Sequence, residues 1–354
     1  MTAGGDLAAR IAPVLGRALG TGLLRLEALP RQLGPRRFAR VWTASGRPPT
    51  LIARVDAPED PAGRPAGAAP EPPLEPLRRL LERAGLPVPR RHGGDPGAGV
   101  ELLEDFGDTS LEAAVRTVPP AERRALYAEA CELVARLQRV AAPEDGSVEA
   151  FRRHLDAPLF AYKAELFASV SLRERGHPAS PAESAAVREA FAQVAEEARA
   201  APARLAHRDY QSANLHVRPD RPPGARLGLI DLQGALLAPP EYDLVCLLRD
   251  SYVELAPEEV ALQLARVRPR LPDAPEPGVF ARRFDLLTLT RKGKDHARFL
   301  QAARDRGDSR YLRFVPATVR ALRAAAGRCA AEGAALARLA ELVFELPEET
   351  PCAR

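Results

Sequence analysis

Cysteines and long apolar segments are both scarce in this 354-residue chain, and each shortage excludes a class of protein. The four cysteines lie far apart, so the sequence offers no CxxC metal or redox pair and no disulfide framework, which fits a reducing compartment. No segment approaches the roughly 20 apolar residues that a membrane helix needs. Arg10, Arg17 and Arg25 interrupt the apolar run that a signal peptide would require. We therefore expect a cytoplasmic protein that does not associate with a membrane.

Lysine and asparagine are nearly absent as well. Only three of the 51 basic residues are lysines, at Lys163, Lys292 and Lys294, and the only asparagine is Asn214. The rest of the chain is rich in Ala, Arg and Pro, which is typical of a GC-rich genome. We expect the few lysines and the asparagine that such a chain retains to be required more often than an average residue.

The charge balance narrows the range of partners. The net charge is +4 and 28% of the residues are charged, with both signs interspersed along the chain. With 46% hydrophobic residues, the chain can bury one large core or the cores of two lobes. This composition excludes a disordered chain and gives only weak support to nucleic-acid binding. We expect a globular monomer with no nucleic-acid partner.

The pattern of the chain changes from strands to helices about one third of the way along. Apolar spacing predicts a helix over residues 5–28, and alternation around a Gly/Pro turn predicts a hairpin of residues 37–43 and 50–55. A Pro/Gly/Ala-rich loop (57–73), a helix (74–84) and a strand (99–103) follow. We expect an α+β, bilobal fold with an N-terminal lobe of residues 1–103, a C-terminal lobe of residues 104–354 and a ligand site between them.

One non-helical segment, residues 204–232, interrupts the helical C-terminal part. The helices predicted before it cover residues 119–137, 148–169 and 182–200. The segment holds Asp209 and Asn214 five residues apart in a loop, and then Asp231 at the end of a short strand. Phosphoryl transfer with Mg²⁺ needs one carboxylate that orients and deprotonates the attacking hydroxyl, and hard oxygen ligands for the metal. Asp209 suits the first role, Asn214 and Asp231 suit the second, and His207 is expected to pack the loop.

The same residues also have a plain structural explanation. A His-Arg-Asp triplet arises easily by chance in an Arg-rich chain, and an Asp in a loop or at a strand end is often solvated or a cap. The single asparagine of the chain nevertheless falls at the spacing that a metal site needs, which argues against coincidence. A hydrolase with paired carboxylates would need neither this asparagine nor two lobes.

The segments His207–Asn214 and Ile230–Asp231 resemble the catalytic and metal-binding loops of the aminoglycoside phosphotransferase/choline kinase superfamily, which has a protein-kinase-like fold. Residues 231–252 are similar to the D-F-Q-D-A…Y-D-L…L-L-R-D-x-Y signature of bacterial cell-wall amino-sugar kinases. These kinases phosphorylate the anomeric hydroxyl of N-acetylmuramate and N-acetylglucosamine. Leu102–Asp108 is similar to their hinge segment and Phe284–Phe299 to their C-terminal helix motif, so the likeness covers nearly the whole chain.

This resemblance implies an ATP- and Mg²⁺-dependent kinase that acts on a small-molecule sugar. The roles that it implies are Asp209 as the catalytic base, Asn214 and Asp231 as metal ligands, Glu104, Asp105 and Phe106 at the adenine, and His207 and Asp243 as supports of the catalytic loop. Asp250, Arg291 and Lys294 are candidate substrate contacts, although a solvated helix position and an ordinary basic helix face explain them as well.

The chain departs from the family pattern at positions that bear on the acceptor and on the nucleotide. Leu232, Gly234 and Thr290 stand where the family has Phe, Asp and Gln, and the carboxylate missing at Gly234 leaves the identity of the sugar open. The N-terminal lobe has no lysine to hold the nucleotide phosphates. Arg54 either takes that role through its bidentate guanidinium or is a surface strand residue. An aminoglycoside or choline kinase and a nucleotide-binding pseudokinase remain as alternatives.

Overall fold

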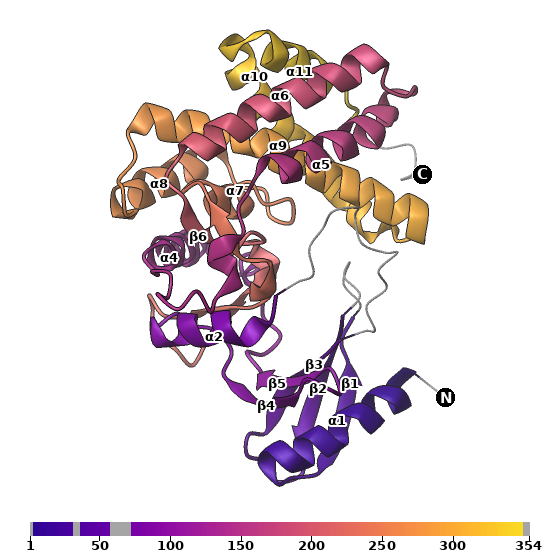
Figure 1. Ribbon diagram of the computed structural model, residues 1–354, viewed down its shortest axis with the longest axis vertical. Helices are drawn as coiled ribbons and strands as arrows, with labels where there is room; N and C mark the ends of the chain where they lie inside the picture. Colours follow the sequence, from indigo (N-terminus) through magenta and orange to yellow (C-terminus); the bar gives the residue numbers. More distant parts are fainter. Residues whose placement is uncertain (1–2, 31–35, 57–71, 350–354) are drawn as a thin grey trace. The chain divides into compact units, whose positions relative to one another are not determined.

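The computed structural model describes residues 3–30, 36–56 and 72–349, and its internal contacts divide it into two units. The first unit comprises Met1–Glu71, Pro87–Asp108 and Gly228–Ile230, and the second comprises Pro72–Leu86, Thr109–Leu227 and Asp231–Arg354. A β-sheet dominates the first unit and helices dominate the second (Figure 1). The α+β fold class predicted from the sequence is therefore confirmed.

The first unit is built on a five-stranded antiparallel sheet with the strand order β1-β2-β3-β5-β4. Its strands are β1 (Leu23–Ala28), β2 (Arg37–Thr43), β3 (Thr50–Val55), β4 (Arg91–Asp95) and β5 (Val100–Glu104). Helix α1 (Ala3–Leu19) lies along one face of this sheet (Figure 1). Its Leu7, Ile11 and Leu15 are fully buried in one cluster with Val41 and Leu51 of the strands. The hairpin predicted from the Gly/Pro turn is β2–β3, with the predicted bounds.

The predicted helix over residues 5–28 is wrong beyond Leu19. Gly20 follows the helix with a left-handed backbone (φ 63°), a conformation that ends helices and that glycine adopts without strain. The remaining residues form β1, which pairs with β2. Strand β4 has no counterpart in the sequence prediction, because its Gly93 and Gly94 lack the apolar side chains that mark a strand.

The second unit is mainly helical. Its α-helices are α2 (Leu74–Arg83), α3 (Leu111–Ala114), α4 (Pro120–Gln138), α5 (Ala157–Ser169), α6 (Pro181–Ala200), α7 (Tyr242–Leu248), α8 (Pro257–Val267), α9 (Pro277–Arg306), α10 (Val315–Cys329) and α11 (Ala334–Phe344). The long helix α9 packs against α5, α6, α7 and α10 and so forms the centre of this unit (Figure 1). No helix among the residues that the structure describes is long and apolar enough to span a membrane.

The helices predicted before the non-helical segment correspond to α4, α5 and α6. The prediction begins α5 too early, because residues 149–152 form a separate 3-10 helix, η2 (Glu149–Arg152). Asp156 then caps α5 by accepting the backbone N–H of Leu159. Ser180 and Glu183 form a capping box at the start of α6. These caps supply partners for backbone groups that a helix start leaves free.

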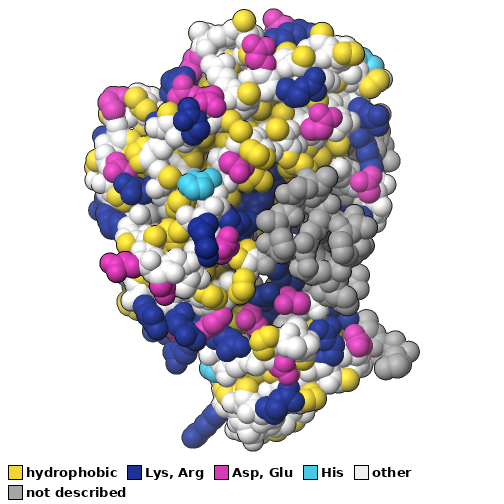
Figure 2. Space-filling view, viewed as in Figure 1, with side chains coloured by type: hydrophobic (Ala, Val, Ile, Leu, Met, Phe, Trp, Pro, Cys, Tyr) yellow, Lys and Arg dark blue, Asp and Glu magenta, His cyan; other side chains and the backbone are white. Residues whose placement is uncertain are grey.

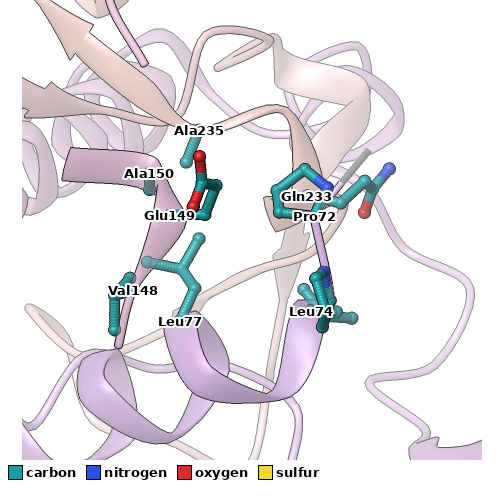
Figure 3. A pocket seen from close by; sticks show the side chains of 9 residues that line it. Pro72, Leu74, Leu77, Val148, Glu149, Ala150, Gln233 and Ala235 are labelled. Carbon is teal, nitrogen blue, oxygen red and sulfur yellow. The ribbon is translucent and has the colours of Figure 1, made fainter. Parts of the chain in front are cut away.

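Helix α2 packs with the second unit, although the sequence prediction assigned it to the N-terminal lobe. Its Leu74 and Leu77 face Val148, Ala150 and Ala235 across a pocket of about 10 Å³ (Figure 3). Such a volume holds about one water molecule. By its contacts the chain thus passes between the units several times, whereas the sequence predicts a single boundary after residue 103.

The non-helical segment supplies two small sheets. Strand β6 (Arg204–Ala206) pairs with β9 (Leu236–Ala238), and β7 (Leu215–Val217) pairs with β8 (Leu227–Leu229). Two short 3-10 helices, η4 (Ser212–Asn214) and η5 (Leu232–Gly234), lie at their ends. The face of the molecule shown in Figure 2 carries basic and acidic side chains scattered together, as the interspersed charges of the sequence predict.

Candidate active site

The loop after β6, residues 207–214, is held by the buried carboxylate of Asp243 in α7. Asp243 accepts the backbone N–H of His207 at 2.7 Å and that of Arg208 at 3.0 Å. Burial raises the pKa of Asp243, and these hydrogen bonds act in the opposite direction. Arg208 has a left-handed backbone (φ 77°), a strained conformation that persists because its surroundings fix it. His207 is buried and meets the ring of Tyr210 edge-on, with 5.7 Å between the centroids, which favours the structural role expected for it.

Asp250 holds the other end of the same loop. Its carboxylate accepts the backbone N–H and the hydroxyl of Ser212 at 2.8 and 2.5 Å, and the backbone N–H of Tyr252 at 3.1 Å. Burial raises the pKa of Asp250, whereas Lys292 and the Ser212 bonds act to lower it. Because both carboxylate oxygens bind the protein, the geometry favours a loop-holding role for Asp250 over the substrate contact that the sequence suggested.

The carboxylate of Asp209 forms an ion pair with Arg291 of α9. Arg291 Nη1 lies 2.9 Å from Asp209 Oδ1, and Lys294 Nζ lies 3.8 Å from the same oxygen. Burial acts to raise the pKa of Asp209, but Lys294, Arg291 and Arg208 outweigh it and hold that pKa well below its ordinary value. Asp209 is therefore ionised at neutral pH and suited to accept a hydrogen bond from a hydroxyl and to orient it.

Asp295 fixes Arg291 in turn, and the sequence analysis missed it. Asp295 Oδ2 lies 3.3 Å from Arg291 Nε and 2.7 Å from Lys292 Nζ, and the same ammonium donates to the hydroxyl of Ser251 at 2.9 Å. Burial acts to raise the pKa of Asp295, but Arg291, Lys292 and Lys294 lower it to about 2. Its position one helical turn after Arg291 is a signal that could have identified it.

Asn214 and Asp231 offer oxygen atoms of the kind that a divalent cation prefers. Asn214 Nδ2 donates to the backbone carbonyl of Asp209 at 2.8 Å, which leaves its Oδ1 for another partner. Asp231 has a left-handed backbone (φ 64°) and accepts the Gln233 side chain at Oδ1 alone. Within residues 3–30, 36–56 and 72–349, no group of three or more His, Cys, Asp or Glu side chains could hold a metal. Two oxygen ligands fit Mg²⁺, which keeps waters and phosphate oxygens in its coordination sphere.

Gly234 brings the segment after Asp231 against the catalytic loop. A Cβ atom at this position would lie 3.5 Å from Asp209 Oδ2 and 3.6 Å from Arg208 Cδ, which is ordinary contact distance. Any side chain here would therefore border the Asp209 carboxylate. The departure from the family pattern at Gly234 thus lies beside the group that would meet the acceptor.

In the first unit, Arg54 of β3 binds two carboxylates. Its guanidinium donates to Glu101 at 2.8 Å and to Asp56 at 3.0 Å, and the residue is 9% exposed. Arg54 and Glu101 are direct cross-strand partners of β3 and β5. These two carboxylates account for the presence of Arg54 without any nucleotide. To bind a nucleotide phosphate, Arg54 would have to release one of them, and the phosphate-binding role of Arg54 stays a prediction.

The three residues expected at the adenine lie at the end of β5. Glu104 accepts the backbone N–H of Arg90 at 3.1 Å, and Asp105 forms an ion pair with Arg40 at 2.6 Å. Burial acts to raise the pKa of Asp105, but Arg40 and a backbone N–H hold it below its ordinary value. Phe106 packs so closely on Gly228 that a Cβ there would lie 2.5 Å from its ring. The side chains thus serve the fold, and contact with adenine stays a prediction for this segment.

The pattern of the phosphotransferase enzyme family matches residues 25–277, which is well over half of the chain. The chain belongs to the phosphotransferase enzyme family, so the predicted family and the prediction of an enzyme are confirmed.

Two curated relatives carry the same name. The chain is 31% identical over 202 residues to an N-acetylmuramate/N-acetylglucosamine kinase of Caulobacter vibrioides, and the match spans 54% of each chain, about half of that relative. It is 28% identical over 280 residues to the Pseudomonas putida protein of that name, over 77% of each chain.

Solved structures confirm the kinase-like fold. Choline kinase LicA from Streptococcus pneumoniae superposes with a TM-score of 0.63 and 14% identity, over 91% of this chain and 99% of that one. A complex of LicA with AMP gives a TM-score of 0.60 at 14% identity, over 94% and 100% of the two chains. At this level of identity the likeness shows the fold alone.

Proposed function

We propose that this enzyme transfers the terminal phosphoryl group of ATP to the anomeric hydroxyl of a cell-wall amino sugar, N-acetylmuramate or N-acetylglucosamine. The names of the two curated relatives support this acceptor, and the family supports the reaction class. The AMP complex of LicA, with the same fold, supports an adenine nucleotide as the donor. The observation that carries the proposal is the setting of Asp209. Arg291 pairs with its carboxylate, and the Asn214 side chain donates a hydrogen bond to its backbone carbonyl.

Five residues of the second unit have a defined part in this proposed reaction. Asp209 accepts a hydrogen bond from the sugar hydroxyl and receives its proton as the bond from the sugar oxygen to the terminal phosphorus forms, while the bond from that phosphorus to the bridging oxygen breaks and ADP leaves. Arg291 keeps the carboxylate in one orientation, and Asp295 keeps Arg291 in place. Asn214 and Asp231 would hold Mg²⁺, which neutralises the phosphate charge when it is bound. Positioning and charge compensation of this kind account for most of the catalysis in phosphoryl transfer.

The surroundings of Asp209 argue against the main alternative acceptors. Aminoglycosides and choline are cations, and a pocket for them should gather carboxylates. Here the charges of Arg208, Arg291 and Lys294 all act on Asp209, the neighbouring Asp295 is paired with Arg291 and Lys292, and Gly234 adds no further carboxylate. The complete set of Asp209, Asn214 and Asp231 likewise argues against a pseudokinase. A neutral or acidic sugar suits this charge distribution better.

A test of the proposal is ATP consumption against a matched panel of acceptors. The panel contains N-acetylmuramate, N-acetylglucosamine, glucose, choline and an aminoglycoside, and phosphorus NMR locates the new phosphate on the product. We expect turnover with the two amino sugars and a phosphate on the anomeric oxygen. Asp209→Asn is the control that should remove turnover with every acceptor. Turnover with choline or the aminoglycoside in place of the amino sugars contradicts the proposal.

A further inference from the structure

Three cations, Lys294, Arg291 and Arg208, act on the carboxylate of Asp209. Lys294 Nζ lies 3.8 Å from Asp209 and 3.9 Å from Asp295, so neither carboxylate forms a close hydrogen bond with it. Arg208 has no side-chain hydrogen bond or ion pair within the described ranges, and it lies beside Asp209 in the loop. A fourth cation, Lys163 of α5, lies within electrostatic reach of both. The cluster formed by Lys163, Arg208 and Lys294 therefore carries an excess of positive charge.

Lys163 is the most deeply buried member of this cluster. It is 4% exposed, and its ammonium lies 4.8 Å from the ring centroid of Phe160 and 5.1 Å from that of Tyr242. Its one hydrogen bond in the part of the chain that the structure covers is a long one, 3.5 Å to the Tyr242 hydroxyl. An ammonium has three N–H donors, so two of them have no partner there. Burial, followed by the neighbouring cations, lowers the pKa of Lys163 well below its ordinary value.

The contrast with Lys292 shows what Lys163 lacks. Lys292 is fully buried too, but its ammonium binds Asp295 at 2.7 Å and Ser251 at 2.9 Å. A buried ammonium without a counter-charge is strongly unfavourable and persists only where something repays its cost. The chain has nearly eliminated lysine elsewhere, and this costly one has been kept. A negatively charged ligand would supply both the missing charge and the missing acceptors.

We propose that Lys163, together with Arg208 and Lys294, binds a carboxylate of the acceptor sugar and thereby favours acidic over neutral acceptors. This inference rests on the proposed function and deepens it. N-acetylmuramate carries a lactyl carboxylate that N-acetylglucosamine lacks, so these two sugars form a matched pair of acceptors. The nucleotide phosphates are the other negatively charged groups that this cluster could bind, but Mg²⁺ at Asn214 and Asp231 would compensate their charge.

The test compares kcat/KM for the two sugars in the full-length protein and in Lys163→Met. Methionine keeps the length of the side chain and its contact with the aromatic rings but removes the charge. We expect kcat/KM for N-acetylmuramate to fall about 10- to 100-fold, the loss typical of one charged hydrogen bond, and that for N-acetylglucosamine to change less than about threefold. Lys163→Arg should restore part of the activity with N-acetylmuramate. The melting temperature of Lys163→Met should equal or exceed that of the parent, because a buried unpaired charge is removed.

Lys292→Met is the matched control. It removes a buried lysine that supports Asp295 and hence Arg291, so both sugars should lose activity to the same extent. If Lys163→Met shows that pattern, or no loss, the carboxylate-binding role of Lys163 is wrong and the proposed function stands. If the parent phosphorylates neither sugar, the proposed function and this inference are both overturned.

Discussion

Replacement of Asp243 by Asn tests whether this buried carboxylate holds the catalytic loop. Asp243 accepts the backbone N–H groups of His207 and Arg208 at 2.7 and 3.0 Å inside the protein. Asparagine keeps the shape but has one acceptor oxygen, so one backbone N–H loses its partner and faces the new NH₂ group. A hydrogen bond to a charged group contributes about 1.5–3 kcal/mol, and a buried unsatisfied donor costs about 1–3 kcal/mol. We expect the free energy of unfolding to fall by about 3–5 kcal/mol.

The same substitution should lower catalysis in the molecules that remain folded. A loop released at His207 and Arg208 displaces Asp209, and a misplaced catalytic group costs about 10²-fold in rate. Denaturant titration measures the stability and steady-state kinetics measure kcat per folded molecule. Asp285→Asn is the control, because Asp285 is also buried but binds Arg328 of α10 at 2.6 Å rather than the loop. It should lose stability and keep kcat, and a fully stable, fully active Asp243→Asn enzyme would refute the argument.

Three further predictions concern catalysis, the metal and acid stability. Asp209→Asn should lower kcat about 10²- to 10⁴-fold and leave ATP affinity nearly unchanged in calorimetry, and an equal loss of both contradicts the base role. Asn214→Ala and Asp231→Ala should each raise the Mg²⁺ concentration for half-maximal turnover, because each removes an oxygen ligand; an unchanged Mg²⁺ dependence contradicts the assignment. His296 is fully buried against Ser171, and burial lowers its pKa from 6.5 to about 4. The unfolded chain therefore binds more protons between these pH values, so the free energy of unfolding should fall by about 3 kcal/mol as the pH drops through them, and His296→Gln should lose that acid sensitivity in urea titrations at several pH values.

The sequence predicts those helices and strands that neighbouring residues specify, and it fails where contacts between distant segments decide the structure. The hairpin β2–β3 has its predicted bounds because alternating side chains and a Gly/Pro turn specify it without distant contacts. Strand β1 was beyond such a prediction, since the apolar spacing of the helix continues into Leu23–Ala28 and only pairing with β2 makes it a strand. Helix α2 is predicted as a helix, but its partners, Val148 and Ala150, lie over 60 residues along the chain.

Some residues of the candidate site can likewise be predicted from a local sequence pattern, whereas others depend on contacts between distant parts of the chain. Asp209, Asn214 and Asp231 can be proposed from the sequence because phosphoryl transfer needs these residue types at a fixed spacing within one segment; their roles stay predictions. Arg54 illustrates the limit, since its contact with Glu101 spans 47 residues and depends on the register of β3 with β5. The cluster around Lys163 was likewise invisible, because α5, the loop and α9 meet only in the folded chain. Its one sequence signal was the rarity of lysine itself.

The protein has only three lysines and two of them are buried, which makes the chemistry of its surface unusual. Lys163 and Lys292 are 4% and 0% exposed, and the Lys294 side chain is 21% exposed, next to Asp209. Burial, with Arg291, lowers the pKa of Lys294 to about 8, so a sizeable fraction of it is the nucleophilic free amine at neutral to mildly alkaline pH. Apart from the N-terminal amine, an acylating dye or crosslinker therefore has one accessible target, and that target lies 3.8 Å from the Asp209 carboxylate. Amine labelling of the unmodified protein becomes a direct optical readout of whether the site is occupied.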